Sequence, residues 1–178
     1  MTNYIANAIH HFETINKHRA LVFEHCVKAG IPLQGLVHDL SKYSPTEFLV
    51  GVKYFQGDHS PNVDERKAKG YSSAWLHHKG RNKHHFEYWF DNSTTSFNIV
   101  PVEMPVKYVI EMFCDRVAAS KVYKGDAYTD HTAFDYFMAH DYSMIMHPKT
   151  KELLQKLLQM LADEGEDATF AYIRTLKK

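Results

Sequence analysis

The chain has 178 residues, of which 44% are hydrophobic and 13% aromatic, so we expect one globular domain over residues 1–178. Basic and acidic residues each total 21, and this balance gives no reason to expect binding to a nucleic-acid duplex or to an anionic membrane. No stretch approaches the roughly 20 apolar residues that span a bilayer, and the start of the chain lacks a signal-peptide core, which together favour a cytoplasmic protein.

Apolar residues at helical spacing predict an all-α fold of about seven or eight helices. The sequence "YSPTEF" marks a clear helix start, with Ser44 as the N-cap, Pro45 at the first helical position and Glu47 three residues after the cap. Strand-like alternation is absent, and residues 57–72 (with one helical turn as an option) and 91–101 are expected to be loops. The predicted helices cover residues 3–29, 33–42, 44–56, 73–90 (with Gly80 as a candidate break), 103–123, 130–140, 148–163 and 167–176.

Polar side chains on apolar helical stripes are the strongest functional signal. His18 lies on the inward stripe of the first predicted helix, and Asp115 lies on that of the helix over 103–123. His38 and Asp39 are adjacent and lie between apolar residues. Each has an ordinary structural explanation by itself, such as a hydrogen-bonded core histidine. Together, imidazole and carboxylate groups aimed at one core favour a metal site, because a buried carboxylate needs a compensating charge.

Four of the 13 histidines fall in "LHHKGRNKHH", residues 76–85. In a continuous helix a spacing of seven residues is close to two turns, so His77 aligns with His84 and His78 aligns with His85. Two tryptophans flank the second pair, so we expect that pair to face the core. A polar helix face that is merely rich in histidine remains the alternative.

The residues of the neighbouring stripe, His77, Arg81 and His84, are candidates for contact with a substrate phosphate. Asn82 lies between His78 and His85 on the stripe that we expect to face inward, and it is a candidate catalytic residue. The planar guanidinium of an arginine binds phosphate through two parallel hydrogen bonds. An exposed arginine in a surface ion pair is as common, so the role of Arg81 stays open at this point.

The order His18, His38-Asp39, Asp115 resembles the HD superfamily of metal-dependent phosphohydrolases. Members of that superfamily are all-helical bundles in which these four residues hold one divalent metal. The segments "HRALVFEHCVKAGI", "GLVHDLSKYSPTEF", "HHKGRNKHHFEYW", "EMPVKYVIEMFCDRVAAS" and "HPKTKELL" more closely resemble a small, largely uncharacterised, His-rich branch of HD-like proteins. That closer resemblance covers most of residues 4–158, and the branch has no firmly assigned substrate.

The resemblance also implies further site residues. HD proteins with two metals often add histidines between the HD dipeptide and the final aspartate, which gives His78 and His85 a role as ligands of a second ion. Lys42 stands three residues after the aspartate, where many members carry a lysine or glutamate near the metal-bound water. The gap of 20 residues between the first two histidine ligands is short for the superfamily. If it cannot close, His11 or His25 is the replacement for the first ligand.

The leading expectation is therefore a metal-dependent phosphohydrolase that acts on a small phosphate ester, with a nucleotide as the favoured class. It would use one or two divalent transition metals (Mn, Fe, Co, Ni or Zn), with Lys42, Arg81 and Asn82 as the catalytic residues around them. One rival is a di-iron oxygenase of the HD-like type. Another is a non-catalytic protein in which the metal staples the bundle or the pocket senses a ligand. The oligomeric state and the substrate are not determined by these residues.

Overall fold

The computed structural model describes residues 3–140, 142 and 145–176. These residues form a mostly α-helical fold, as the periodicity predicts, with one small antiparallel hairpin. The α-helices are α1 (Tyr4–Lys28), α2 (Pro32–Val37), α3 (Pro45–Tyr54), α4 (Pro61–Lys69), α5 (Ser73–Lys79), α6 (Val106–Lys124), α7 (Thr132–Met138) and α8 (Pro148–Thr175). Three short 3-10 helices, η1 (Leu40–Tyr43), η2 (Phe86–Tyr88) and η3 (Gly125–Ala127), lie in the connections.

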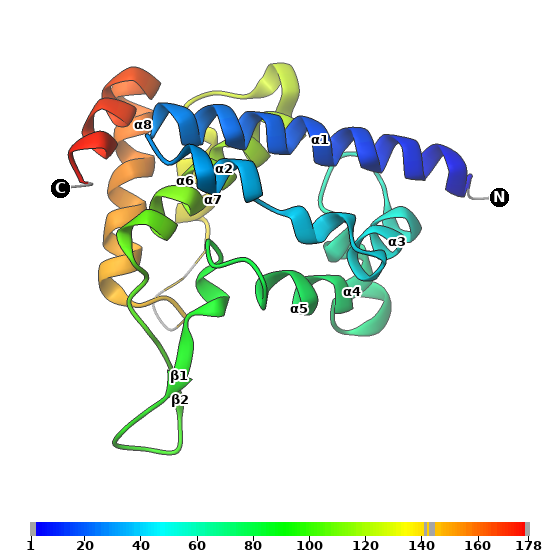
Figure 1. Cartoon of the computed structure of the whole chain (residues 1–178), viewed down its shortest axis with the longest axis horizontal. Coiled ribbons are helices and arrows are strands. Elements are labelled where there is room, and N and C mark those ends of the chain that lie inside the picture. Colours follow the sequence, from blue (N-terminus) through cyan, green and yellow to red (C-terminus); the bar gives the residue numbers. More distant parts are fainter. Residues whose placement is uncertain (1–2, 141, 143–144, 177–178) are drawn as a thin grey trace.

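The long helix α1 runs along one side of the molecule, and several other helices pack against it (Figure 1). It contacts α2, α3 and α6, while α8 packs against α6 and α7. The apolar core lies between α1, α6 and α8, where Val22, Phe113 and Leu157 are fully buried. The helices α3, α4 and α5 gather beside the N-terminal half of α1, away from this core (Figure 1). No helix in the described part of the chain is long and apolar enough to cross a membrane.

The second predicted helix is shorter than expected, and this difference matters for the site. Helix α2 ends at Val37, so His38 and Asp39 lie in the turn between α2 and η1 rather than on a helix. Asp39 has a φ of 54° and is the only non-glycine residue with positive φ in the described ranges. An L-residue other than asparagine or aspartate rarely takes this left-handed conformation, and such strain is concentrated at functional sites.

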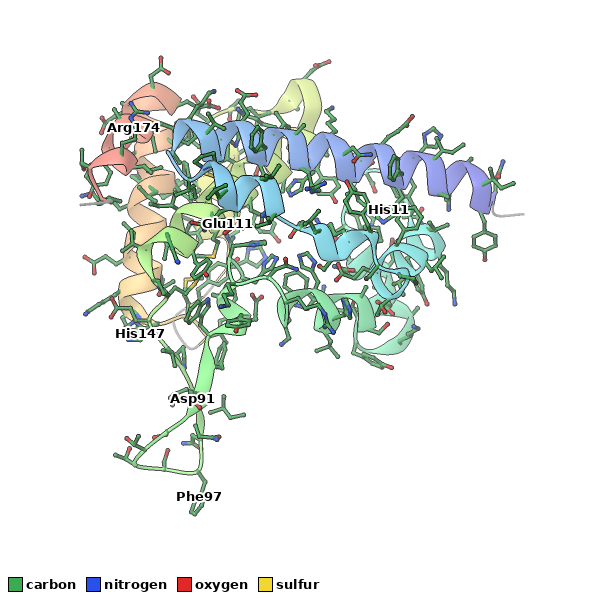
Figure 2. All side chains as sticks on the ribbon, in the orientation of Figure 1. His11, Asp91, Phe97, Glu111, His147 and Arg174 are labelled. Carbon is green, nitrogen blue, oxygen red and sulfur yellow. The ribbon has the colours of Figure 1, made fainter. Side chains whose placement is uncertain are left out.

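Three other predictions about the chain between 57 and 101 differ from the structure, although the candidate break at Gly80 matches the observed end of α5. The expected loop 57–72 contains α4, and the expected helix over 73–90 ends at Lys79 and is followed by a turn and η2. The expected loop 91–101 contains most of a hairpin in which β1 (Phe90–Asn92) pairs with β2 (Ile99–Pro101). Figure 2 shows this hairpin projecting from the helices, with Phe97 at its tip. Three residues per strand are too few to show an alternating pattern in the sequence.

The last two predicted helices form one element, α8, with a kink. Gly165 has a φ of 79° inside α8, and the helix continues on its far side to Thr175. Glycine takes this conformation without a steric penalty. The helix can therefore bend at Gly165 and continue, with no loop between its two parts. Helix α7 begins after His131, one residue later than a cap at Asp130 would place it.

The carboxylate of Glu65 fixes the connection between α4 and α5. It accepts hydrogen bonds from the Oγ atoms of Ser72 at 2.7 Å and Ser73 at 2.6 Å, and from Lys69 Nζ at 2.8 Å. Burial raises the pKa of Glu65, but these donors outweigh burial and lower the pKa to about 2. Glu65 therefore stays ionised and sets the starting point of α5, the helix that carries two of the histidines.

Candidate metal centre

Three histidines follow one buried stripe of α1 at intervals of two turns, and only the middle one reaches the site. His18 Nε2 lies 3.0 Å from Asp115 Oδ1, on α6. His11 lies one interval away beside α3, and His25 lies at the other end, where its Nε2 atom is 3.1 Å from Lys121 Nζ. The short gap between His18 and His38 therefore closes, and neither replacement for His18 is needed.

A guanidinium holds the His38-Asp39 turn in place. Arg19 donates to the carbonyl oxygen of His38 at 2.8 Å through Nε and to that of Leu36 at 3.0 Å through Nη2. Its Nη1 atom donates to Tyr43 Oη at 3.1 Å. The carbonyls at the end of a helix lack partners within the helix, so Arg19 both caps α2 and fixes the strained backbone of Asp39.

Four residues form the first compartment: His18, His38, Asp39 and Asp115. The Nε2 atom of His38 lies 3.4 Å from Asp39 Oδ2 and 3.5 Å from Asp115 Oδ1. His18 Nε2 lies 3.9 Å from Asp39 Oδ2. The structure thus brings together the four residues that the sequence pattern selects as ligands of one metal.

Four residues form the second compartment: Asp39, His78, His84 and His85. Asp39 Oδ1 lies 3.2 Å from His78 Nε2 and 3.4 Å from His84 Nε2. The Nε2 atoms of His78 and His85 are 2.9 Å apart. Asp39 therefore presents one carboxylate oxygen to each compartment. We call the seven residues of both compartments the histidine–aspartate cluster.

The positions of the nitrogen and oxygen atoms in the cluster suit coordination of a metal ion better than hydrogen bonding to one another. His38 Nε2, His84 Nε2 and Asp39 Oδ1 are buried, and no hydrogen bond with acceptable geometry reaches them from the described residues, whereas Asp39 Oδ2 lies 2.7 Å from Lys42 Nζ. Ligand atoms about 2.1 Å from a tetrahedral ion lie ~3.4 Å from each other. The four distances between imidazole nitrogens and carboxylate oxygens in the first compartment range from 3.0 to 3.9 Å, around that value. The buried histidine and carboxylate groups can therefore hold a metal ion.

Two carboxylates outside the cluster orient its histidines. Glu111 Oε1 lies 3.0 Å from His38 Nδ1 and 3.1 Å from His84 Nδ1. Glu47 Oε2 lies 2.8 Å from His78 Nδ1. An ionised carboxylate only accepts hydrogen bonds, so each of these Nδ1 atoms carries the proton and directs Nε2 at the cluster. This carboxylate–histidine arrangement is typical of metal-binding histidines.

The charges of the cluster favour exchange of protons for a cation. Burial lowers the pKa of His78, but Asp39 and Glu47 outweigh burial and raise the pKa to about 9. Asp39, Asp115 and Glu111 likewise outweigh burial and raise the pKa of His38 above its ordinary value. Burial raises the pKa of the Asp115 carboxyl, but the imidazoles of His18 and His38 reverse this and hold it low. A metal ion would displace protons from the imidazoles of His38 and His78, so metal binding should release protons.

His84 is a cluster residue that the sequence pattern assigns to the wrong group. A continuous helix would place it beside His77, one stripe away from the site, but α5 ends at Lys79. The turn that follows brings His84 into the second compartment, where 1% of its surface is exposed. His77 instead contacts Glu47, with 2.6 Å between Nδ1 and Oε1.

The three predicted catalytic residues lie in different surroundings. Lys42 Nζ is 2.7 Å from Asp39 Oδ2, at the edge of the first compartment. Asn82 lies behind the second compartment, where its Nδ2 atom donates to the carbonyl oxygen of His78 at 2.8 Å and to Ser41 Oγ at 2.9 Å. Arg81 is exposed and donates to the carbonyl oxygen of His77 at 3.2 Å, so the structure does not bring it to the cluster.

A pocket of about 500 Å³ opens on both compartments. Five residues of the cluster line it, together with Phe55 after α3, Arg66 on α4, Trp75 on α5 and Arg116 on α6. Trp75 packs against the rings of both His78 and His85, at centroid distances of 5.7 and 4.7 Å. A cavity of this volume is in the range of small-molecule sites.

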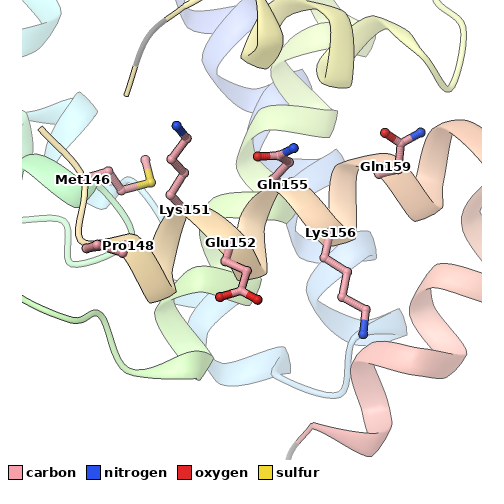
Figure 3. Close-up of a pocket in the computed structure, with 7 residues that line it drawn as sticks. All are labelled: Met146, Pro148, Lys151, Glu152, Gln155, Lys156 and Gln159. Atoms are coloured by element: carbon pink, nitrogen blue, oxygen red, sulfur yellow. The ribbon is translucent and has the colours of Figure 1, made fainter. Parts of the chain in front are cut away.

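A second hollow, of about 490 Å³, lies along one face of α8 (Figure 3). Lys151, Gln155 and Gln159 project into it at intervals of one helical turn. No residue of the histidine–aspartate cluster lines this hollow, and none of its lining residues is a histidine, cysteine or aspartate. It therefore adds nothing to the metal site.

One wall of the pocket depends on a close approach between α1 and α3, and this predicts a large effect of a small substitution. A Cβ atom on Gly51 would lie 2.0 Å from His11 Nε2. We expect Gly51→Ala to lower the free energy of unfolding by about 1–3 kcal/mol, because an overpacked interior must shift side chains or backbone. Urea denaturation of the two proteins measures the difference.

Gly80→Ala is the matched control. Its Cβ atom would meet nothing closer than the carbonyl oxygen of Leu76 at 3.4 Å, and its φ of −75° suits any L-residue. We expect its stability to stay within about 1 kcal/mol of the wild type. Equal stability of the two variants would show that His11 does not require the space at Gly51.

One sequence-family match covers the whole of the histidine–aspartate cluster. No curated protein and no solved structure matches the chain. The sequence model of one family, described as a family of unknown function (DUF5662), matches residues 7–160. That range contains all seven residues of the histidine–aspartate cluster and both carboxylates that orient them. Since the match covers most of the 178 residues of the chain, the chain belongs to family DUF5662.

Proposed function

We propose that this protein is a metal-dependent phosphohydrolase of the HD type that acts on a small phosphate ester, with nucleotides as the first class to test. The observation that carries the proposal is the position of Asp39. Its two carboxylate oxygens face two separate groups of ligand atoms, and both groups open on one pocket. Paired metal sites that share a ligand are typical of enzymes that displace an oxygen at phosphorus.

The ions would be two of Mn, Fe, Co, Ni or Zn, because imidazole and carboxylate together suit these metals better than Ca. When bound, such an ion lowers the pKa of a coordinated water and neutralises charge on a phosphoryl oxygen. In the hydrolysis, the oxygen of one water bonds to phosphorus and the bond from phosphorus to the ester oxygen breaks. One proton of that water goes to the leaving alcohol, and the other remains with the phosphate and solvent.

The surrounding side chains would bind and orient the phosphate ester. Burial lowers the pKa of Lys42, but Asp39 and Asp115 outweigh burial and raise it, so the ammonium group that lines the pocket stays positive and attracts the phosphoryl group. Burial lowers the pKa of His11 to about 4, which leaves an uncharged imidazole on the wall. Its Nδ1 atom is buried and has no hydrogen-bond partner among the described residues.

The test uses purified protein stripped with a chelator and reloaded with one metal at a time. We expect Mn²⁺, Co²⁺ or Ni²⁺ to restore release of inorganic phosphate from at least one member of a panel of nucleoside phosphates and simple phosphate esters. Loading should bind two ions per chain and release protons, since the imidazoles of His38 and His78 carry protons that the metal displaces.

Protein that binds two ions per chain but releases no phosphate from any substrate with any of these metals would contradict the proposal. If chelation then lowers the melting temperature sharply, the metal has a structural role. A sharp loss of stability together with turnover is compatible with the proposal, because a ligand that binds only the folded state stabilises it.

A di-iron oxygenase is the second candidate. The two compartments share Asp39 and offer imidazole and carboxylate ligands, a combination that suits iron as well as Mn, Co, Ni or Zn. That reading predicts two iron atoms per chain and a visible absorption band after exposure to air. Full phosphohydrolase activity with Mn²⁺ or Ni²⁺, neither of which carries out iron-based oxygen chemistry, would decide against it.

A further inference from the structure

Arg116 lies next to the cluster in a position that the proposed hydrolysis does not use. It follows Asp115 on α6 and lines the same pocket. Its guanidinium lies over the ring of Tyr142 at 5.3 Å and that of Phe137 at 5.8 Å from the ring centroids. Nη1 is 3.5 Å from Tyr142 Oη. Two aromatic rings therefore hold the planar group in a defined orientation before any ligand arrives.

This guanidinium lacks an acidic partner in the part of the chain that the structure describes. No carboxylate there lies within 4.0 Å of Arg116 or of Arg66, the other arginine of the pocket wall. Glu87 lines the same pocket and interacts electrostatically with both arginines, but no ion pair within 4.0 Å joins it to either of them. Lys42, in contrast, is paired with Asp39 at 2.7 Å. A half-buried cation without a direct ion-pair partner suits an anionic ligand, since buried charges are normally paired.

Arg116 and the cluster contact the pocket from different directions. Successive residues of an α-helix are rotated by about 100°, so Asp115 faces His18 and His38 while Arg116 turns toward α7 and Tyr142. Lys42 already provides a cation at the cluster itself. A volume of about 500 Å³ also exceeds what one phosphate group needs and leaves room for an organic spacer.

We propose that the substrate carries two anionic groups: the phosphoryl group that reacts at the histidine–aspartate cluster, and a second phosphate or carboxylate that Arg116 binds. This inference rests on the proposed function, because it takes the cluster as the site of the phosphoryl group. It narrows the substrate class to phosphate esters with an additional anion separated from the ester by an organic spacer. Arg66, on the exposed rim beside Trp75, adds positive charge at the same mouth.

The test measures binding rather than turnover, with probes that cannot be hydrolysed. Calorimetric titration of Mn²⁺-loaded protein compares propylphosphonate with alkane-diphosphonates whose two phosphonates are separated by three to six carbons. We expect the best diphosphonate to bind at least about tenfold more tightly than the monophosphonate, from one additional charge-assisted pair. Arg116→Gln should abolish this advantage and leave the affinity for the monophosphonate within about twofold, while Arg116→Lys should keep part of it.

The matched control is Arg174→Gln. Arg174 is on α8, far from the pocket residue His11 in Figure 2, and donates to the carbonyl oxygen of Lys28. We expect this variant to bind both probes like the wild type. If the monophosphonate binds but no diphosphonate binds more tightly, or if the advantage survives in Arg116→Gln, the inference is wrong and the proposed function stands. If neither probe binds the metal-loaded wild type, both are wrong. The wild-type comparison decides the matter even if Arg116→Gln fails to fold.

Discussion

Asp39→Asn is expected to remove metal from both compartments at once, which is the largest effect of any single substitution in the cluster. Each carboxylate oxygen of Asp39 faces a different compartment, so the change removes one anionic ligand from each. We expect both metal affinities to fall by at least about 100-fold, beyond the 10–100-fold loss typical of an outer hydrogen-bonding partner. Elemental analysis after dialysis and calorimetric titration with Mn²⁺ measure the two affinities.

Asparagine is the right replacement because of the backbone at this position. Asp39 has a φ of 54°, a conformation that asparagine tolerates and that would cost alanine about 1–2 kcal/mol. His18→Ala and His84→Ala are the matched variants, since each belongs to one compartment only. We expect each of them to reduce the metal content from two ions to one. An Asp39→Asn protein that still holds one ion with wild-type affinity would show that the carboxylate is not shared.

The long helices of this protein could be predicted from its sequence because apolar residues recur at helical spacing over many turns, although α1 buries one face and α6 is buried on most sides. The stripes of α1 and α6 are long enough to fix which residues face inward, and they placed His18 and Asp115 correctly. The last helix was divided in two at Gly165, where the structure has a kink instead. The hairpin and α4 were missed because short elements have too few residues for a periodicity to emerge.

The second compartment could be predicted only in part, because tertiary contacts end α5 early. Asn82 Nδ2 donates back to the carbonyl oxygen of His78 and also to Ser41 Oγ, on η1. Such a contact between distant segments overrides the helix propensity of the residues that follow. The pattern correctly predicted that His78 and His85 face the site, but it wrongly placed His84 on the neighbouring stripe with His77. The one local signal for a break was Gly80.

The two orienting carboxylates were not recognised as site residues, although each leaves a trace in the sequence. Glu111 precedes Asp115 by four residues and so shares its face of α6. Glu47 fits the pattern of a capping box, but the side chain of Ser44 makes no capping bond and Glu47 turns to His77 and His78. A glutamate that fits a helix-capping pattern gives no sign in the sequence that its carboxylate binds histidines of another segment instead.

Glu111→Gln is expected to weaken metal binding in both compartments although Glu111 is not among their ligands. Burial raises the pKa of Glu111, but hydrogen bonds from His38 and His84 outweigh burial and lower the pKa to about 2. Its Oε1 atom faces both of these Nδ1 atoms, and its Oε2 atom accepts from Gln34 Nε2 at 2.7 Å. A glutamine has one amide NH₂ group, which would meet a donor in either orientation. The two imidazoles then lose their fixed tautomer and direction.

The expected loss is about 10–100-fold in affinity for each ion, the range found when such outer partners of metal-binding histidines are removed. Glu47→Gln is the matched variant, because Glu47 contacts His78 in the second compartment and no residue of the first. We expect Glu47→Gln to lower the affinity of the second compartment for its ion and to leave the affinity of the first compartment unchanged. Calorimetric titration with Mn²⁺ resolves the two steps. A Glu111→Gln protein that loses affinity in only one compartment would mean that one of its two histidines is oriented by something else, and that the two compartments are not coupled through this carboxylate.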